Sequence, residues 1–355
     1  MFKSLTKILG VRQSSVRDVK LDIMKGIGII LVVYGHTYSN SSFLYLFHMP
    51  LFFILSGAAM SYSAHGYSVY RRFKAIMIPY FVFSVLCFCY WILIESKLRP
   101  IHEEALFMGH IGYFPIKIQQ FINIFLAENC TNSFEYNVVL WFLPCLFVAD
   151  FICAGINKIK FQWLAVILAV TSYYLLIDKL PCLPFCLNIA ILAVPLIWLG
   201  KIGYKFIIKH FNNHCLVCPV LSMALFVILY EMFSCLGIRS NMLANKIPPF
   251  YSFYSASIVG SMGVILMSLA ISRITIRGGQ ILAFLGKNSL VVMCIHEPIK
   301  RILLVLCSKI SQLPVDILRS DLILSAGCTL VIALTCVPFI YMINSKYLKW
   351  MLGKF

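Results

Sequence analysis

Long hydrophobic runs, separated by short polar connections, dominate the chain. Each run is close to the roughly 20 residues that an α-helix needs to cross the hydrocarbon core of a bilayer. The runs fall at residues 21–38, 44–63, 73–95, 137–157, 161–178, 184–201, 215–236, 251–273, 284–308 and 320–344. This pattern predicts an all-α integral membrane protein. We expect a single bundle of about ten transmembrane helices, with residues 1–355 as one domain.

Ionisable residues lie in or beside the first run, where charge is costly and usually functional. Asp22 is one helical step before Lys25, so these two side chains can pair. The spacing of Lys25 and His36 brings both to the same face of a helix, about 16 Å apart along its axis. His48 begins the second run. A turn at residues 39–43 would let the two imidazoles meet near one rim of the bundle.

The composition supports membrane insertion. Hydrophobic residues make up 61% of the chain and charged residues 12%, with a mean hydropathy of +0.89, whereas soluble domains carry roughly 25% charged residues. The formal net charge of +17 is also compatible with nucleic-acid binding. However, Lys and Arg occur in short caps between apolar runs, as the positive-inside rule expects. We therefore predict a lipid bilayer, and no nucleic acid, as the partner of this charge.

The connections between runs differ in their content of Lys and Arg, depending on the side of the membrane. One set holds Lys3, Lys7, Arg12, Arg17, Lys20, Arg71, Arg72, Lys74, Lys158, Lys160, Lys201, Lys205, Lys209, Arg273, Arg277, Lys287, Lys346, Lys349 and Lys354. The other, smaller set holds Lys97, Arg99, Lys117, Lys179, Arg239, Lys246, Lys300, Arg301, Lys309 and Arg319. The richer set should face the cytoplasm. Both termini are then cytoplasmic, and the rim near His36 faces outward.

The order of residues in the first two runs resembles a known family. The matching segments are Leu21-Asp22-x-x-Lys25-Gly26, Gly35-His36, Phe47-His48-Met49-Pro50-Leu51-Phe52-Phe53 and Ser56-Gly57. They resemble the acyltransferase-3 family, bacterial membrane proteins that transfer acetyl or other acyl groups to sugar hydroxyls. Further along, Trp141-Phe142-Leu143, Leu285-Gly286-Lys287-Asn288-Ser289-Leu290 and His296 are similar to its fucose 4-O-acetylase-like branch.

This resemblance implies an O-acyltransferase of the bacterial cytoplasmic (inner) membrane. The donor would be acyl-CoA, with acetyl-CoA expected, and the acceptor a hydroxyl of a cell-surface or lipid-linked glycan. Such a transfer needs a base, donors for the developing oxyanion and cations for the phosphates of the donor. An imidazole titrates near neutral pH, and both this chemistry and the resemblance assign the base to His36. A histidine that only packs in the core is the alternative.

Other residues are assigned supporting roles. His48 would orient His36 or donate to the oxyanion, while Asp22 and Ser56 lie on the matching segments. His296 and Glu297 fall within the ninth run, where a buried carboxylate needs a partner. They are either part of the site or a structural polar lock. The pattern does not distinguish direct transfer from an acyl-enzyme route.

The donor phosphates are predicted to bind cations at the cytoplasmic end, namely Lys25, Arg71, Arg72 and Lys74. Ordinary positive-inside anchoring is the alternative for the last three. Many family members carry Arg-x-x-Arg where this chain has Arg71-x-x-Lys74, and lysine lacks the bidentate fork of arginine. The extended arm of the donor would run along the first helix and bring the thioester beside His36.

Two further features have competing interpretations. The segment 210–218 offers four possible zinc ligands, but they are nearly contiguous, unlike those of common zinc fingers, and we predict no metal. These ligands are His210, His214, Cys215 and Cys218. The longest connection, residues 96–136, has apolar residues at helical spacing, which predicts an interfacial helix. This helix is either a lid over the acceptor site or a plain structural helix.

Two other functions fit a polytopic chain with ionisable residues in its spans. A transporter or flippase for a sugar or glycan also uses such residues for its substrate path, although we find no inverted repeat. A non-catalytic partner in polysaccharide assembly is the third interpretation. The family resemblance favours the acyltransferase.

Overall fold

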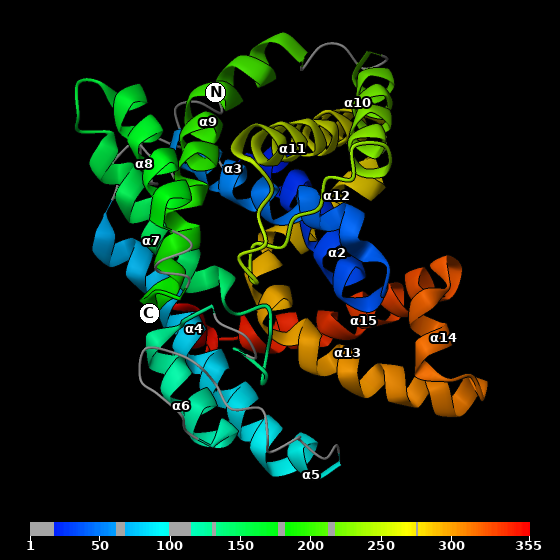
Figure 1. Ribbon diagram of the computed structural model, residues 1–355. Coiled ribbons are helices and arrows are strands. Elements are labelled where there is room, and N and C mark those ends of the chain that lie inside the picture. Colours follow the sequence, from blue (N-terminus) through cyan, green and yellow to red (C-terminus); the bar gives the residue numbers. More distant parts are fainter. Residues whose placement is uncertain are drawn as a thin grey trace, which may run out of the picture.

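The computed structural model describes residues 18–61, 68–98, 115–129, 133–176, 182–211, 217–274 and 276–355. Within these ranges the regular secondary structure is helical apart from one isolated bridge between Asn241 and Lys246, which confirms the all-α class (Figure 1). The longer helices are α2 (Val19–Thr37), α3 (His48–Ser61), α4 (Val69–Tyr90), α6 (Ile116–Leu126), α7 (Phe142–Ile156), α8 (Gln162–Leu176), α9 (Leu187–Phe211), α10 (Val217–Ser234), α11 (Phe250–Ile274), α12 (Ile276–Lys287), α13 (Ser289–Ser311) and α15 (Leu322–Ile343). Shorter elements are η1 (Ser41–Leu46), η2 (Trp91–Glu95), α5 (Ser96–Leu98), η3 (Pro184–Cys186), α14 (Val315–Ser320) and η4 (Lys349–Leu352).

Six helical stretches of the described chain are long and apolar enough to cross a membrane. They are Ser41–Ser61, Val69–Glu95, Pro184–Phe211, Val217–Ser234, Phe250–Arg273 and Leu322–Ile343. Helices α7 and α8 are apolar but shorter, and α2 and α13 carry several charged residues. The chain is therefore a multi-pass membrane protein by its helices, and the total of ten spans remains a prediction.

Two of the predicted runs have different boundaries in the structure. The run at 137–157 becomes helical only at Phe142, because residues 133–141 form successive turns. The run at 284–308 is divided at Asn288, where α12 ends and α13 begins. The end of α12 and the start of α13 both line a cavity that is described below.

Helix α2 lies inside the bundle. It packs along α12 and also contacts α3, α11, α13 and α15, and Figure 1 shows it between α13 and α15 on one side and α3 and α11 on the other. The closest approach is to α12, where a Cβ at Gly286 would meet the backbone carbonyl of Asp22. Small residues at such crossings let membrane helices come into direct backbone contact.

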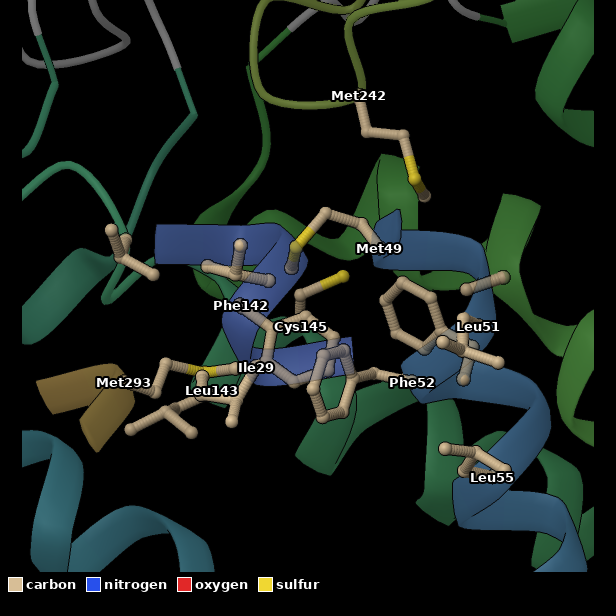
Figure 2. Close-up of a cluster of buried hydrophobic side chains, with 14 of the residues drawn as sticks. Ile29, Met49, Leu51, Phe52, Leu55, Phe142, Leu143, Cys145, Met242 and Met293 are labelled. Atoms are coloured by element: carbon tan, nitrogen blue, oxygen red, sulfur yellow. The ribbon is translucent and has the colours of Figure 1, made fainter. Parts of the chain in front are cut away.

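The core between α2, α3 and α7 is apolar. Figure 2 shows Ile29 of α2, Phe52 of α3 and Phe142 of α7 packed together, with the Phe52 and Phe142 ring centroids 5.9 Å apart. Helix α3 is buried from His48 to Ala58 without interruption. A helix that is hydrophobic on all sides is buried either in a protein core or in a bilayer, and α3 lies in the protein core.

The helix predicted in the longest connection exists as α6, with apolar and polar side chains on different faces. Ile118, Phe121 and Phe125 are exposed, whereas Gln120 and Asn123 are buried. The buried side chains accept backbone hydrogen bonds, since Gln120 Oε1 lies 3.0 Å from the amide of Glu135. Helix α6 therefore attaches to the protein through its polar face and presents an apolar face outward.

Candidate active site

Helix α2 is fixed at its N-terminal end by a side-chain cap. Asp18 is the N-cap residue, and its Oδ1 accepts a hydrogen bond of 3.0 Å from the amide of Lys20. Its second carboxylate oxygen accepts a hydrogen bond of 2.8 Å from the hydroxyl of Tyr204. The cap satisfies an amide that would otherwise lack a partner at the helix start. The cap therefore fixes where α2 begins, and with it the positions of Lys25 and His36 along the helix.

The other end of α2 is held by two cations from distant elements. Lys300 Nζ donates to the carbonyl oxygen of His36 at 3.2 Å, and Arg319 Nε donates to that of Thr37 at 3.2 Å. Arg319 also accepts a backbone hydrogen bond of 2.8 Å from Ser39. The last carbonyls of a helix lack intrahelical partners and favour positive charge. Lys300 and Arg319 therefore fix the turn that carries His36.

The ring that packs against His36 belongs to His296, with ring centroids 5.8 Å apart. His48, which the sequence suggested could meet His36, lies within electrostatic range of it. Tyr45 lies between them, with ring centroids 5.0 Å from His48 and 6.4 Å from His36. The site thus brings together His36, His296, Tyr45 and His48. Tyr45 contacts both histidines of the first two helices, and the sequence analysis had given it no role.

Two of these histidines keep a basic nitrogen available. Nδ1 of His48 lies 2.6 Å from the Leu44 carbonyl oxygen, and Nδ1 of His296 lies 2.9 Å from that of Val292. A carbonyl only accepts, so in each neutral ring the proton sits on Nδ1 and Nε2 is an acceptor. Neither Nε2 has a hydrogen-bond partner within the described ranges, although both rings are buried. Each can therefore accept a hydrogen bond or a proton from a bound molecule.

Helix α13 carries a buried ion-pair network next to these rings. The Glu297 side chain is only 4% exposed, and its oxygens lie 2.7 and 2.8 Å from Lys300 Nζ and 3.1 Å from Arg301 Nε. Arg301 also donates to Glu95 Oε2 at 2.8 Å and to the Glu135 carbonyl at 3.0 Å. Buried charges persist when they are paired in this way. The predicted Glu297 thus has its partners, and His36 lies within its electrostatic range.

The placement of Lys300 and Arg301 corrects the sequence analysis, which counted both as cations of an outer connection. They lie within α13 and are largely buried. Their removal from the smaller set of loop cations increases the charge difference between the two sides. Their spacing of three and four residues from Glu297 is the helical spacing of ion pairs, and it was the available signal.

A second polar cluster lies at the Lys25 end of α2. Asp150, fully buried in α7, accepts a hydrogen bond of 2.8 Å from Ser56 Oγ and one of 2.5 Å from Arg72 Nε. Arg72 also donates to Ser56 Oγ at 2.5 Å. Lys25 is close enough to interact electrostatically with Asp150. Asp150 of α7 thus joins Ser56 of α3 to the guanidinium of Arg72 in α4.

Two cavities open beside this cluster, and no Asp or Glu is among the described residues that line them. The first has a volume of about 850 Å³ and includes Ser56 and four cations, Arg71, Arg72, Lys158 and Lys201. The second has a volume of about 350 Å³ and includes four cations, Arg71, Lys74, Lys287 and Lys354.

The residues predicted to bind the donor are thus divided. Arg71 lines both cavities, Arg72 only the first and Lys74 only the second. Lys25 lines neither cavity but lies near Asp150. Asp22 is buried where α2 crosses α12 and belongs to neither group of lining residues.

Two of the four possible zinc ligands lie in a part of the chain that the structure does not describe. His214 and Cys215 lie outside the described residues, so the segment 210–218 cannot be assessed as a whole. In the part of the chain that the structure describes, no group of three His, Cys, Asp or Glu side chains could hold a metal ion.

The bundle of apolar helices and its internal clusters of ionisable residues define a membrane protein with a functional site inside the helix bundle. A family model described as an acyltransferase domain matches residues 18–342. The chain therefore belongs to the acyltransferase-3 family and is an acyltransferase. No curated protein and no solved structure matches it significantly.

Proposed function

We propose that this protein is a membrane O-acyltransferase that moves an acyl group, expected to be acetyl, from cytoplasmic acyl-CoA to a hydroxyl of a cell-surface or lipid-linked glycan. One observation carries the proposal: two different polar sites lie at opposite ends of α2. His36, His296 and Glu297 form one, and the cationic cavities near Lys25 form the other. This arrangement suits a donor and an acceptor that approach from opposite sides of a bilayer.

The cavity of about 850 Å³ suits the diphosphate of the donor. Arg71, Lys158 and Lys201 supply positive charge on a wall that carries no carboxylate among its described residues. Arg72 is paired with the buried Asp150, so it lines the cavity but adds little net positive charge. Cations that line a cavity attract phosphate groups through charge-assisted hydrogen bonds. From there, the extended pantetheine arm would follow α2 over about 16 Å to His36.

The orientation rests on two independent arguments. The connections rich in Lys and Arg lie at the Lys25 end, which the positive-inside rule assigns to the cytoplasm. Cys182, which comes shortly before α9 at the His36 end, is disulfide-bonded. Disulfides persist in oxidising compartments outside the cytoplasm. Both arguments direct the His36 end outward, with the bacterial inner membrane as the location.

In the proposed reaction, His36 accepts the proton of the acceptor hydroxyl as its oxygen attacks the thioester carbonyl. The carbon–sulfur bond then breaks, and the departing CoA thiolate takes the proton from His36, which restores the neutral imidazole. Nε2 of His296 or of His48, which has no protein partner among the described residues, would accept a hydrogen bond from the acceptor sugar. Glu297 would stabilise positive charge on His36 after proton transfer, because opposite charges attract strongly away from water.

The purified protein in liposomes, supplied with acetyl-labelled acetyl-CoA and an extract of membrane glycans, tests this function. We expect the label on a glycan hydroxyl. Movement of a sugar or glycan across the liposome membrane without acylation would instead support a transporter or flippase. The acceptor is then identified by mass spectrometry of the labelled product.

A further inference from the structure

The cavity of about 350 Å³ is assembled from three parts of the chain that are far apart in sequence. Arg71 and Lys74 come from the first turns of α4, Lys287 from the end of α12, and Lys354 from the last residues of the chain. Figure 1 places the C-terminus beside α4. Two of its cations, Lys287 and Lys354, have no role in the reaction described above.

The C-terminal segment is fitted closely to α4. Gly353 has a φ of +66°, and a Cβ at this position would collide with the carbonyl of Lys74. The ammonium of Lys74 lies between two aromatic rings, 4.5 Å from the Tyr70 centroid and 4.9 Å from that of Phe355. Such cation–π contacts restrict a lysine that would otherwise move freely. Lys74 is therefore held in place, and Lys354 Nζ donates a hydrogen bond of 3.1 Å to Asn344 Oδ1.

The first turn of α13 adds a further source of positive potential. Leu290 and Val291 of this turn line the cavity, and the N-cap residue Asn288 makes no side-chain cap. Its amide group is engaged elsewhere, because Nδ2 donates to the Phe284 carbonyl and Oδ1 accepts from Asn344. The start of a helix directs amide groups and a positive dipole at whatever lies before it. Four cations and this helix end together favour a compact, highly charged anion.

A phosphate monoester meets that requirement better than a phosphodiester. A monoester carries a charge of about −1.5 to −2 at neutral pH, whereas a diester carries a single charge. Arg71 lines both cavities. If one molecule placed a phosphate group in each cavity, the Arg71 guanidinium would lie between the two groups. Coenzyme A has this form, with a diphosphate on the 5′ carbon and a monoester on the 3′ carbon of one ribose.

We infer that Lys287 and Lys354, which join Arg71 and Lys74 in the smaller cavity, bind the 3′-phosphate of the acyl-CoA donor and make the enzyme select CoA over dephospho-CoA, which lacks that group. This inference rests on the proposed donor. Lys287 and Lys354 act as specificity-determining residues for the donor, while the larger cavity takes the diphosphate. The same phosphate chemistry is offered by the headgroup of an anionic lipid, which the test must separate.

The test measures the dissociation constants of CoA and dephospho-CoA with the full-length protein in phosphatidylcholine nanodiscs. We expect the wild type to bind CoA at least about tenfold more tightly, as one strong charge-assisted contact provides. The variant with Lys287→Ala and Lys354→Ala should bind both ligands equally, with the dephospho-CoA constant unchanged. Arginine at both positions should retain the preference. Lys346→Ala, an exposed cation outside both cavities, is the matched control and should behave as wild type.

Different failures have different meanings. If the wild type binds CoA but the double alanine variant keeps the full preference, the 3′-phosphate assignment is wrong and the proposed function stands. If, in addition, the two lysines are required for thermal stabilisation by phosphatidylglycerol, the cavity takes a lipid headgroup. If the wild type binds neither CoA nor dephospho-CoA, the donor itself is wrong, and this inference is overturned with it.

Discussion

Charged residues are arranged differently at the two ends of α2. At the His36 end, Glu297, Lys300 and Arg301 are largely buried and form a closed ion-pair network. At the Lys25 end, cations such as Arg71 and Lys158 line open cavities without a carboxylate among the described lining residues. Proton transfer needs groups fixed to within fractions of an ångström, whereas phosphate binding needs a concentrated field. Under the proposed function, this difference suits a paired, neutralised end for proton transfer and an open, positive end for donor binding.

The largest expected effect comes from breaking the closed network with Glu297→Gln. This change leaves Lys300 and Arg301 buried without their shared carboxylate, which costs about 3–5 kcal/mol for a broken buried pair. We expect a clear fall in the unfolding temperature in detergent and a loss of acyl transfer of at least about 100-fold, since His36 also loses its nearby anion. Glu231→Gln, at an exposed carboxylate of α10, is the control. Equal melting of the two variants would show that the network contributes nothing.

Substitutions of the neighbouring Arg71 and Arg72 at the Lys25 end should have different effects, one on donor binding and the other on stability. Arg72→Ala removes the partner of the fully buried Asp150, and we expect it to cost at most about 3 kcal/mol because the Arg72 side chain is 29% exposed. Arg71→Ala should leave the unfolding temperature unchanged and raise the KM for acyl-CoA about tenfold. Thermal unfolding and steady-state kinetics on both variants check this. A reversed pattern would remove Arg71 from the donor site.

A smaller effect should follow from Arg319→Gln, which weakens the hold on the last turn of α2. Arg319 acts through the position of His36, so kcat should fall about tenfold, as a misplacement of reacting groups does. The KM for acyl-CoA should not change, because the donor binds at the other end. Arg319→Lys keeps the charge and should recover part of the rate. A change in KM alone would contradict a positioning role.

Ionic strength should affect donor binding at the Lys25 end but not the reaction step at the His36 end. Raising the ionic strength from about 0.05 to about 0.5 M shortens the screening length and should raise the KM for acyl-CoA several-fold. The saturated rate should remain nearly constant, because the buried network around Glu297 is poorly screened. Steady-state kinetics at several salt concentrations measure both. A flat KM with a falling saturated rate would assign the salt-sensitive step to the His36 end.

The sequence predicted what depends on neighbouring positions. The apolar runs located the helices, and the spacing of Lys25 and His36 placed both on one face of α2, because helical periodicity is a local property. The cations of the Lys25 end were identified from their position between runs. The helix at Ile116–Leu126 was also expected from its spacing.

The remaining features depend on contacts between distant segments. No local pattern brings His296 against His36 or Arg72 against Asp150, since each contact joins separate helices. Helix α6 was expected from its spacing, but the partners of its polar side chains were not. Its apolar face points outward because lipid, rather than water, surrounds the bundle, and its polar side chains find partners inside. The pairing of Glu297 with Lys300 and Arg301, by contrast, was readable from spacing within one helix.

The central claim is that His36 transfers protons at one end of α2 while the donor binds at the other. The most direct measurement compares donor binding with acyl transfer in His36→Ala, using His210→Ala, at an exposed histidine of α9, as the control. We predict that His36→Ala binds acyl-CoA within about twofold of wild type and loses about 10²–10⁴-fold in transfer, the range of general-base catalysis. Transfer at the wild-type rate, or a loss of donor binding equal to the loss of transfer, would contradict this account.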